Sequence, residues 1–238
     1  MKFSAPLVRG TLEQRYKRFL ADITLENGET VTAHCANPGA MTGLKTPGSE
    51  VWLSPNQNPK AKLDWRWELI RVDEHLIGVS TAHPNAIVAA AIEAGKVPEL
   101  AGYSTQRREV PYGKNSRIDV LLEDEDRPAC YVEVKNVNLR RTDGPHPSAA
   151  EFPDSVTKRG AKHLDEMSDM VNAGHRAVMF YLVQREDCDH FRIAGDIDPH
   201  YAETLAKARS IGVETICYTC RMSLEGIELS APLPMELG

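Results

Sequence analysis

Apolar and polar positions alternate along residues 85–238 with periods that predict helices and strands in turn. An almost wholly apolar run at residues 177–183 is typical of a strand buried on both faces. The predicted elements, in chain order, are a helix from an Asn85 cap to Gly95, strands at 107–112, 116–122 and 130–137, a helix from a Ser155 cap to 173, a strand at 177–183, a helix from Asp198 to 212 and a last strand at 213–219. This order indicates an α/β core with one central mixed sheet.

The first 84 residues carry a different pattern, in which short apolar stretches are separated by turns such as Asn27-Gly28 and Pro47-Gly48. This pattern predicts a small β barrel or open sheet. The chain therefore divides into a β domain at residues 1–84 and an α/β domain at residues 85–238. Two tryptophans in the first part, Trp65 and Trp67, could stack on bases, but a place in the core is the favoured interpretation.

Three charged side chains stand on two neighbouring predicted strands. Glu133 and Lys135 share one strand face because side chains alternate along a strand. If the two strands pair as a hairpin, Asp119 lies beside Glu133, with Lys135 next to both. This is the pattern of PD-(D/E)xK nucleases, although the same residues also fit a half-solvated strand with an ordinary surface ion pair. The apolar neighbours of Asp119 favour the first interpretation, since an unpaired carboxylate there would be costly to desolvate.

The chemistry of these residue types fits a divalent metal, Mg²⁺ or Mn²⁺. Mg²⁺ prefers oxygen ligands and keeps several waters, so one or two carboxylates are enough to hold it. Asp119, Glu133 and the backbone carbonyl of Val134 are the predicted ligands. The metal would lower the pKa of a bound water and stabilise charge on a phosphate, and Lys135 would orient the attacking water.

The predicted helix after this pair of strands places basic side chains along an apolar stripe. The stripe consists of Val156, Ala161, Leu164, Met167 and Val171. The basic side chains form two rows at i,i+4 spacing, Lys158 with Lys162 and Arg159 with His163. A solvated helix face is the alternative, but residues 135–163 carry six Lys or Arg against three Asp or Glu. That local excess of positive charge predicts contacts with phosphates.

Composition limits the partners. The chain has 28 Lys plus Arg against 34 Asp plus Glu, which gives a formal charge of −6 at pH 7. Tight non-specific binding of nucleic acid by the whole surface is therefore excluded, and any binding must come from a local basic patch. Five cysteines without regular spacing predict free thiols in a reducing cytoplasm. Charged residues near the start leave no apolar signal segment, and no span reaches transmembrane length, so no membrane partner is expected.

Several stretches spread along the chain form a distinctive set of motifs. They are residues 14–22, His34-Cys-Ala-Asn-Pro-Gly-Ala-Met41, 109–113, Ser116-Arg-Ile-Asp119, Tyr131-Val-Glu-Val-Lys-Asn136, Phe152-Pro-Asp-Ser-Val-Thr157 and 159–164. Together they resemble the sugar fermentation stimulation protein family, SfsA, nearly end to end. The resemblance implies an N-terminal OB-fold-like domain and a C-terminal PD-(D/E)xK restriction-endonuclease-like domain. It also implies DNA binding and a historical link to the regulation of sugar, especially maltose, metabolism.

Carried over residue by residue, the family's catalytic positions fall on Asp119, Glu133 and Lys135. The positions expected to contact nucleic acid are Arg159, Lys162, His163 and, particular to this chain, Lys158. Further candidate site residues are Glu93, Glu109, Asn136 and Asp154.

Two classes of function fit the sequence. The first is a metal-dependent nuclease that hydrolyses phosphodiester bonds, and the second is a non-catalytic DNA-binding regulator of sugar metabolism. The intact Asp119, Glu133 and Lys135 favour the nuclease, because two carboxylates facing an anionic ligand have no evident use without a metal. An α/β protein with a plain ion-pair network ranks last. DNA is favoured over RNA, strandedness and sequence preference stay open, and the sequence leaves room for a homo-oligomer.

Overall fold

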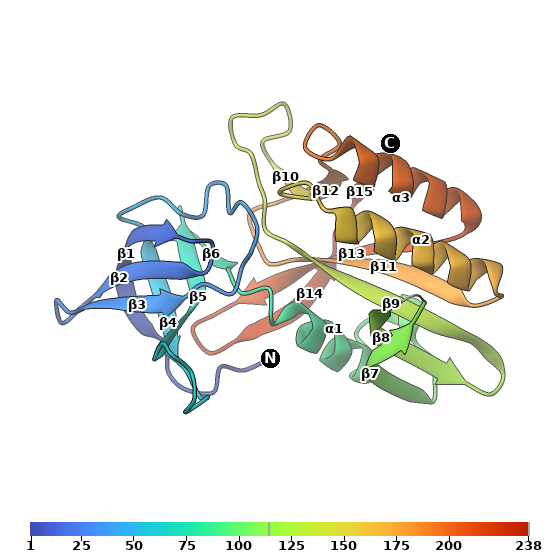
Figure 1. The fold of residues 1–238 in the computed structure, drawn as a ribbon, viewed down its shortest axis with the longest axis horizontal. Helices are drawn as coiled ribbons and strands as arrows, with labels where there is room; N and C mark the ends of the chain where they lie inside the picture. Colours follow the sequence, from blue (N-terminus) through green and yellow to red (C-terminus); the bar gives the residue numbers. More distant parts are fainter. Residues whose placement is uncertain (114, 238) are drawn as a thin grey trace.

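The N-terminal part of the chain forms a small closed β barrel in the computed structural model, which describes residues 1–113 and 115–237 (Figure 1). Its strands are β1 (Val8–Tyr16), β2 (Leu20–Leu25), β3 (Thr30–His34), β4 (Glu50–Pro55), β5 (Trp65–Val72) and β6 (His75–Gly78). They lie in the order β3-β2-β1-β4-β5-β6, and a parallel pairing of β3 with β5 closes the barrel. Trp67 is fully buried in its core and donates its indole N–H to the Leu69 carbonyl at 2.9 Å, so the core interpretation of Trp67 is confirmed.

The C-terminal part is built on a six-stranded mixed sheet. Its strands are β7 (Thr105–Tyr112), β8 (Ser116–Asp124), β9 (Arg127–Val137), β11 (Arg176–Val183), β13 (Glu214–Met222) and β14 (Ile227–Pro232). The order is β14-β13-β11-β9-β8-β7, with the three central strands parallel to one another and the outer pairs antiparallel. The central β11 is buried from its second residue on, as its apolar sequence predicts.

Alternation along β11 sends its side chains to two different helical layers. Phe180 and its even-numbered neighbours pack with α1 (Pro84–Glu93) on one face. Tyr181 and its odd-numbered neighbours pack with α2 (Lys158–Asn172) and α3 (Pro199–Ile211) on the other. Figure 1 shows α1 and the α2–α3 pair on opposite faces of the sheet. Because side chains alternate between the two faces of each strand, the sheet can pack against helices on both sides and forms the middle layer of the domain.

A second, three-stranded parallel sheet lies beside this core. It consists of β10 (Ala149–Phe152), β12 (His190–Ile193) and β15 (Met235–Glu236), in that spatial order. A short 3₁₀ helix, η1 (Pro98–Leu100), follows α1. None of the helices in the described ranges is long and apolar enough to cross a membrane.

The predicted fold class, a small OB-like barrel followed by an α/β core, is confirmed, but several element ends were wrong. Asn85 does not cap α1; its N-cap is His83, and Pro84 takes the first helical position, which suits its fixed φ. Ser155 does not cap α2; Thr157 does, and its Oγ1 accepts the Gly160 amide at 3.0 Å. The Thr157 amide is itself held by the Asp198 carboxylate at 2.7 Å, which sets where α2 begins.

Two further expectations about the core were wrong. Residues 213–219 are not the last strand, because β14 and β15 follow them. Val156 precedes α2 and is 67% exposed, so it is no part of the apolar stripe. The boundary after residue 84 stays a prediction; backbone hydrogen bonds such as Gly78 N–H to the Gln184 carbonyl at 3.0 Å tie the barrel to the core.

Candidate metal and nucleic-acid site

Asp119 and Glu133 lie on the adjacent antiparallel strands β8 and β9, next to the Val120–Val132 pair. The Asp119 carboxylate takes the place of a strand acceptor, since its Oδ2 accepts the backbone N–H of Val134 at 2.7 Å. Lys135 donates from Nζ to Oε1 of Glu133 at 2.8 Å. The hairpin therefore brings the three predicted side chains together as the alternation of the strands requires.

Asn85 joins this cluster from the start of α1, a role that the sequence did not indicate. Its side-chain amide donates to Oδ1 of Asp119 at 2.6 Å and lies 3.2 Å from Oε1 of Glu109. Both oxygens of Asp119 thus have donors, and Glu109, a predicted candidate, reaches the cluster through Asn85. An asparagine at the start of a helical pattern indicates a cap, and this signal gave no sign of the contact with Asp119.

Glu133 is 3% exposed, and its two oxygens have very different surroundings. Oε1 receives Lys135 Nζ and is in hydrogen-bond contact with Nδ1 of His163. Oε2 is buried and has no hydrogen-bond partner among residues 1–113 and 115–237. A buried acceptor without a donor costs free energy, and a cation bound at this oxygen would remove that cost.

The two carboxylates have pKa values shifted in opposite directions. Burial, followed by the charge of Glu133, raises the pKa of Asp119 to about 6. Burial also acts to raise the pKa of Glu133, but Lys135 and His163 outweigh it and hold that pKa below its ordinary value. Neighbouring carboxylates whose pKa values are moved apart are typical of functional sites.

His163 holds Glu133 in place from α2. Arg159 donates from Nε to Nε2 of His163 at 3.3 Å, so Nε2 is the acceptor and Nδ1 carries the proton donated to Glu133. His163 is only 3% exposed. The structure therefore places it against a carboxylate, and its predicted contact with nucleic acid stays untested.

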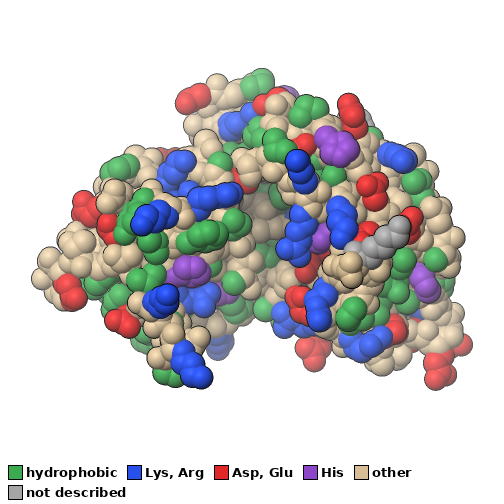
Figure 2. Space-filling model, in the orientation of Figure 1, with side chains coloured by type: hydrophobic (Ala, Val, Ile, Leu, Met, Phe, Trp, Pro, Cys, Tyr) green, Lys and Arg blue, Asp and Glu red, His purple; other side chains and the backbone are tan. Residues whose placement is uncertain are grey.

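The remaining predicted phosphate contacts lie at the start of α2. Lys158 and Arg159 are exposed there, and Lys162 donates to Oγ of Ser116 at 3.2 Å while lying 3.4 Å from Glu166. Figure 2 shows a hollow between the barrel and the core with Lys and Arg side chains along its edges. This arrangement gives an acidic chain a local basic surface beside the carboxylates.

Tyr112 is a further residue close enough to be affected by the charge of Glu133, and the sequence carried no sign of this position. It ends β7, and its buried hydroxyl has no hydrogen-bond partner within the described part of the chain. Burial first, and the charge of Glu133 second, hold its pKa above the ordinary value, so the hydroxyl keeps its proton. A tyrosine in a strand usually fills a core, and nothing in the sequence distinguished this one.

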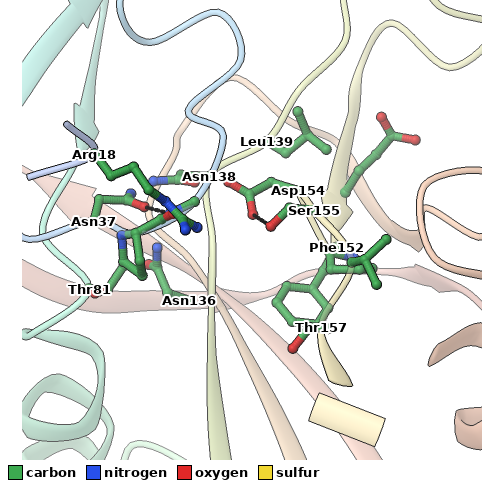
Figure 3. Close-up of a pocket in the computed structure, with 15 residues that line it drawn as sticks. Arg18, Asn37, Thr81, Asn136, Asn138, Leu139, Phe152, Asp154, Ser155 and Thr157 are labelled. Carbon is green, nitrogen blue, oxygen red and sulfur yellow. Dashed lines mark hydrogen bonds between the residues drawn. The ribbon is translucent and has the colours of Figure 1, made fainter. Parts of the chain in front are cut away.

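Three other candidates lie apart from the carboxylates. Glu93 is exposed at the end of α1 and lines a different cavity with Tyr103 and Arg108. Asn136 and Asp154 line a cavity between the barrel and the core, shown in Figure 3. These three residues therefore line cavities whose walls do not include Asp119 or Glu133, and their predicted part in the site stays a prediction.

The oxygen donors of the Asp119–Glu133 pair fit a hard divalent cation. A separate group of potential metal-ligand atoms comes from His190 and Glu236 on the small sheet and from His146 in the loop before β10, and these atoms lie within 4.8 Å of one another. Its two imidazoles suit softer transition metals rather than Mg²⁺. Experiments on the carboxylate pair therefore need a metal that discriminates between the two groups.

Comparison with known proteins identifies the family of the chain. Residues 14–79 match the family model for the SfsA N-terminal OB domain, and residues 82–226 match that for the sugar fermentation stimulation protein RE domain. A sugar fermentation stimulation protein homolog of Paramagnetospirillum magneticum is 64% identical over 237 residues, covering 100% of this chain and 98% of the relative. A homolog of Rhodospirillum centenum is 57% identical, covering 99% and 100%.

A solved structure of Pyrococcus furiosus SfsA in complex with Ca²⁺ superposes with a TM-score of 0.88 at 25% identity, covering 99% of this chain and 98% of that one. Similarity over the full length, in sequence and in fold, leads to one conclusion. The chain belongs to the sugar fermentation stimulation protein family.

Proposed function

We propose that this protein is a metal-dependent nuclease that hydrolyses phosphodiester bonds at Asp119, Glu133 and Lys135. The observation that carries the proposal is the asymmetry of Glu133. One oxygen is held by Lys135 and His163, and the other is buried without a donor among the described residues. A structural ion pair would satisfy both oxygens, whereas a metal site keeps one for the ion.

Asp119 and Glu133 would hold the metal, and the carbonyl of Val134 is the proposed third ligand. The Ca²⁺ bound by the related Pyrococcus furiosus protein supports a hard divalent ion, because Ca²⁺ and Mg²⁺ both prefer oxygen ligands. When bound, such an ion lowers the pKa of a coordinated water and stabilises negative charge on a phosphate. Mg²⁺ or Mn²⁺ is the proposed catalytic ion.

The side chains around the pair have separate tasks. Asn85 fixes Asp119, and His163 fixes Glu133, so both carboxylates are oriented before any ion arrives. Lys135 is largely buried, with 13% of its side chain exposed, and its ammonium group places positive charge beside Glu133. It orients the attacking water and offsets charge that develops on the phosphate.

Nucleic acid is the proposed substrate, with DNA favoured over RNA. Arg159 and Lys158 at the exposed start of α2 supply positive charge next to the carboxylates. In a chain of net charge −6, this surface is where a phosphate backbone is attracted.

The test is a cleavage assay on labelled single- and double-stranded DNA and RNA with Mg²⁺, Mn²⁺ or EDTA. Wild type is compared with Lys135→Ala and with Lys207→Ala, a matched control at an exposed lysine of α3. We expect metal-dependent cutting in wild type and Lys207→Ala, and cutting slowed by about 10²- to 10³-fold in Lys135→Ala. Absence of cutting with retained binding of one nucleic acid would instead identify the non-catalytic, DNA-binding regulator.

A further inference from the structure

A cavity of about 270 Å³ lies where the barrel meets the core, and nothing in the proposed chemistry uses it. We call it the junction pocket; it is lined by Arg18, Asn37 and Thr81 on the barrel side and by Asn136, Asn138 and Phe152 on the core side (Figure 3). Three stretches that carry the family resemblance, residues 34–41, 131–136 and 152–157, each contribute to its wall. Segments far apart in sequence therefore converge on one small space.

The junction pocket is linked to the proposed catalytic site through α2. Thr157, which lines the pocket, caps the helix that carries Arg159 and His163, and His163 contacts Glu133. Asn136 follows Lys135 on β9, so its side chain lies on the opposite face of that strand. A ligand in the pocket thus lies at the start of the helix whose histidine holds Glu133.

The pocket wall offers amide groups held in fixed orientations. Asn37 is 2% exposed; its side chain donates to the Val79 carbonyl at 2.9 Å and accepts the Gly39 amide at 2.9 Å. The side-chain oxygen of Asn136 accepts from Gln184 at 2.6 Å, which directs its amide nitrogen away from Gln184. Asn37, with both of its amide groups engaged, shapes the wall, and Asn136 is the amide that presents a donor to a ligand, which is the chemistry that reads the edges of nucleobases.

Apolar groups stand beside these amides. Phe152 lines the pocket from β10, and Pro38 lines it from the barrel. Val156 also lines it and is 67% exposed, which makes it one of only three large hydrophobic side chains exposed in the described ranges. Apolar surface next to oriented amides suits a flat, neutral, hydrogen-bonding ring.

The charges of the pocket argue against a phosphate inside it. Asp154 lines the wall, and its carboxylate packs so closely on Gly39 that a Cβ there would come within 2.1 Å of Oδ2. An anion in the pocket would be repelled by this carboxylate. The exposed Arg18, which donates to the Pro38 carbonyl at 2.7 Å, lines the pocket from the solvent side and suits a backbone phosphate. The volume lies below the roughly 300 Å³ at which drug-sized sites begin, and so fits a single ring system.

We propose that the junction pocket binds one unstacked nucleobase of the strand whose adjacent phosphate is cut at Lys135. This inference rests on the proposed nuclease function and deepens it. The preferred substrate is then a single strand, or a duplex that presents a splayed-out nucleotide, because a base inside a regular helix cannot enter such a pocket.

The test is a scan of single-stranded oligonucleotides in which one abasic site is moved along the chain. Binding is measured by fluorescence anisotropy in a Lys135→Ala background, in which cleavage is slow. We expect one position at which removal of the base weakens binding about tenfold, the loss typical of one base contact. The position effect should disappear in Val156→Ala and in Thr81→Trp, which occludes the pocket from an exposed barrel position.

Leu224→Ala serves as the matched control, since Leu224 is another exposed hydrophobic residue and lies in the turn between β13 and β14. The control should keep the position effect. If the protein binds the oligonucleotide with the same affinity wherever the abasic site is placed, the base pocket is overturned and the nuclease proposal still stands. Failure to bind any nucleic acid, together with absence of metal-dependent cutting by wild type, would overturn both.

Discussion

Two buried glutamates, Glu68 in the barrel and Glu133 in the core, differ in how hydrogen-bond donors are distributed over their two oxygens. Each is 3% exposed and each contacts a histidine. Glu68 has a partner for each oxygen, with Ser54 Oγ at 2.7 Å and His83 Nε2 at 2.6 Å. Glu133 receives both of its donors on Oε1 and keeps Oε2 unpartnered in the described part of the chain.

Burial and a histidine partner are shared by both glutamates, so they do not by themselves distinguish the proposed metal ligand. Burial acts to raise the pKa of both glutamates, and the hydrogen bonds and charges of their neighbours outweigh it in both cases. What differs is the distribution of donors over the two oxygens. A buried oxygen without a donor is tolerated where a ligand satisfies it, and this is the physical mark of the proposed metal site.

The largest expected effect comes from Glu133→Gln compared with Glu68→Gln. We expect Glu133→Gln to lower metal-dependent cleavage by a factor on the order of 10³ or more, because the ion loses a charged ligand. Glu68→Gln should keep cleavage within about twofold but lose about 1–3 kcal/mol of unfolding free energy, because it loses charge-assisted hydrogen bonds. Gel-based cleavage rates and urea denaturation measure the two effects.

Calcium binding gives the same comparison without catalysis. At 100 times its Kd, Ca²⁺ should stabilise wild type and Glu68→Gln by about 2.7 kcal/mol and leave Glu133→Gln unchanged. A His146→Ala background removes the second group of candidate ligands from the measurement. Equal stabilisation of all variants by Ca²⁺ would mean that Glu133 holds no metal.

Lys135→Ala sharpens the comparison by removing one donor from Oε1 of Glu133. We expect cleavage to fall by about 10²- to 10³-fold while Ca²⁺ still binds, because lysine acts on the water and the phosphate and is no metal ligand. Isothermal titration with Ca²⁺, run beside the cleavage assay, separates the two. Loss of metal binding in this variant would mean that Lys135 only maintains the site.

Asp119→Asn tests the raised pKa of the neighbouring carboxylate. A pKa of about 6, above the ordinary 3.8, means that the stability from holding the proton is present below pH 3.8 and is lost as pH rises through 6. In EDTA, Asp119→Asn should therefore be more stable than wild type by about 1–3 kcal/mol at pH 8, with the difference vanishing near pH 4. Urea denaturation across this range measures it, and a pH-independent difference would contradict the shift.

Arg159→Ala has the smallest expected effect. If Arg159 makes one phosphate contact, its removal should weaken binding several-fold and reduce the slope of log K against log salt by about one unit. Arg209→Ala, at an exposed position of α3, is the matched control. An unchanged slope for Arg159→Ala would mean that Arg159 contacts no phosphate and only orients His163.

The sequence predicted the parts of the site that depend on local periodicity. Glu133 and Lys135 lie two residues apart on one strand, so they must share a face wherever that strand goes. The hairpin turn between β8 and β9 then requires Asp119 to lie nearby. The three helices, the strands β7, β8, β9, β11 and β13 of the core and its α/β class followed from the same two- and three-to-four-residue periods, whereas β10, β12, β14 and β15 were not predicted.

The parts that were missed depend on contacts between distant segments. Asn85 carries the signal of a helix cap, and only the packing of α1 against β8 brings it to Asp119. The start of α2 was misplaced because Asp198, 41 residues from Thr157, holds the amide at that point. The helix preference of a local stretch of sequence cannot reveal a hydrogen-bond partner that lies far away in the chain.

The sequence by itself determined that two carboxylates and a lysine would meet on adjacent strands, because strand geometry fixes neighbouring side chains regardless of the rest of the fold. Only the tertiary structure decided which glutamate oxygen has no donor and which residues of the barrel and core enclose the junction pocket. These features arise where elements far apart in sequence pack together, and their hydrogen bonds are set by that packing rather than by any local pattern.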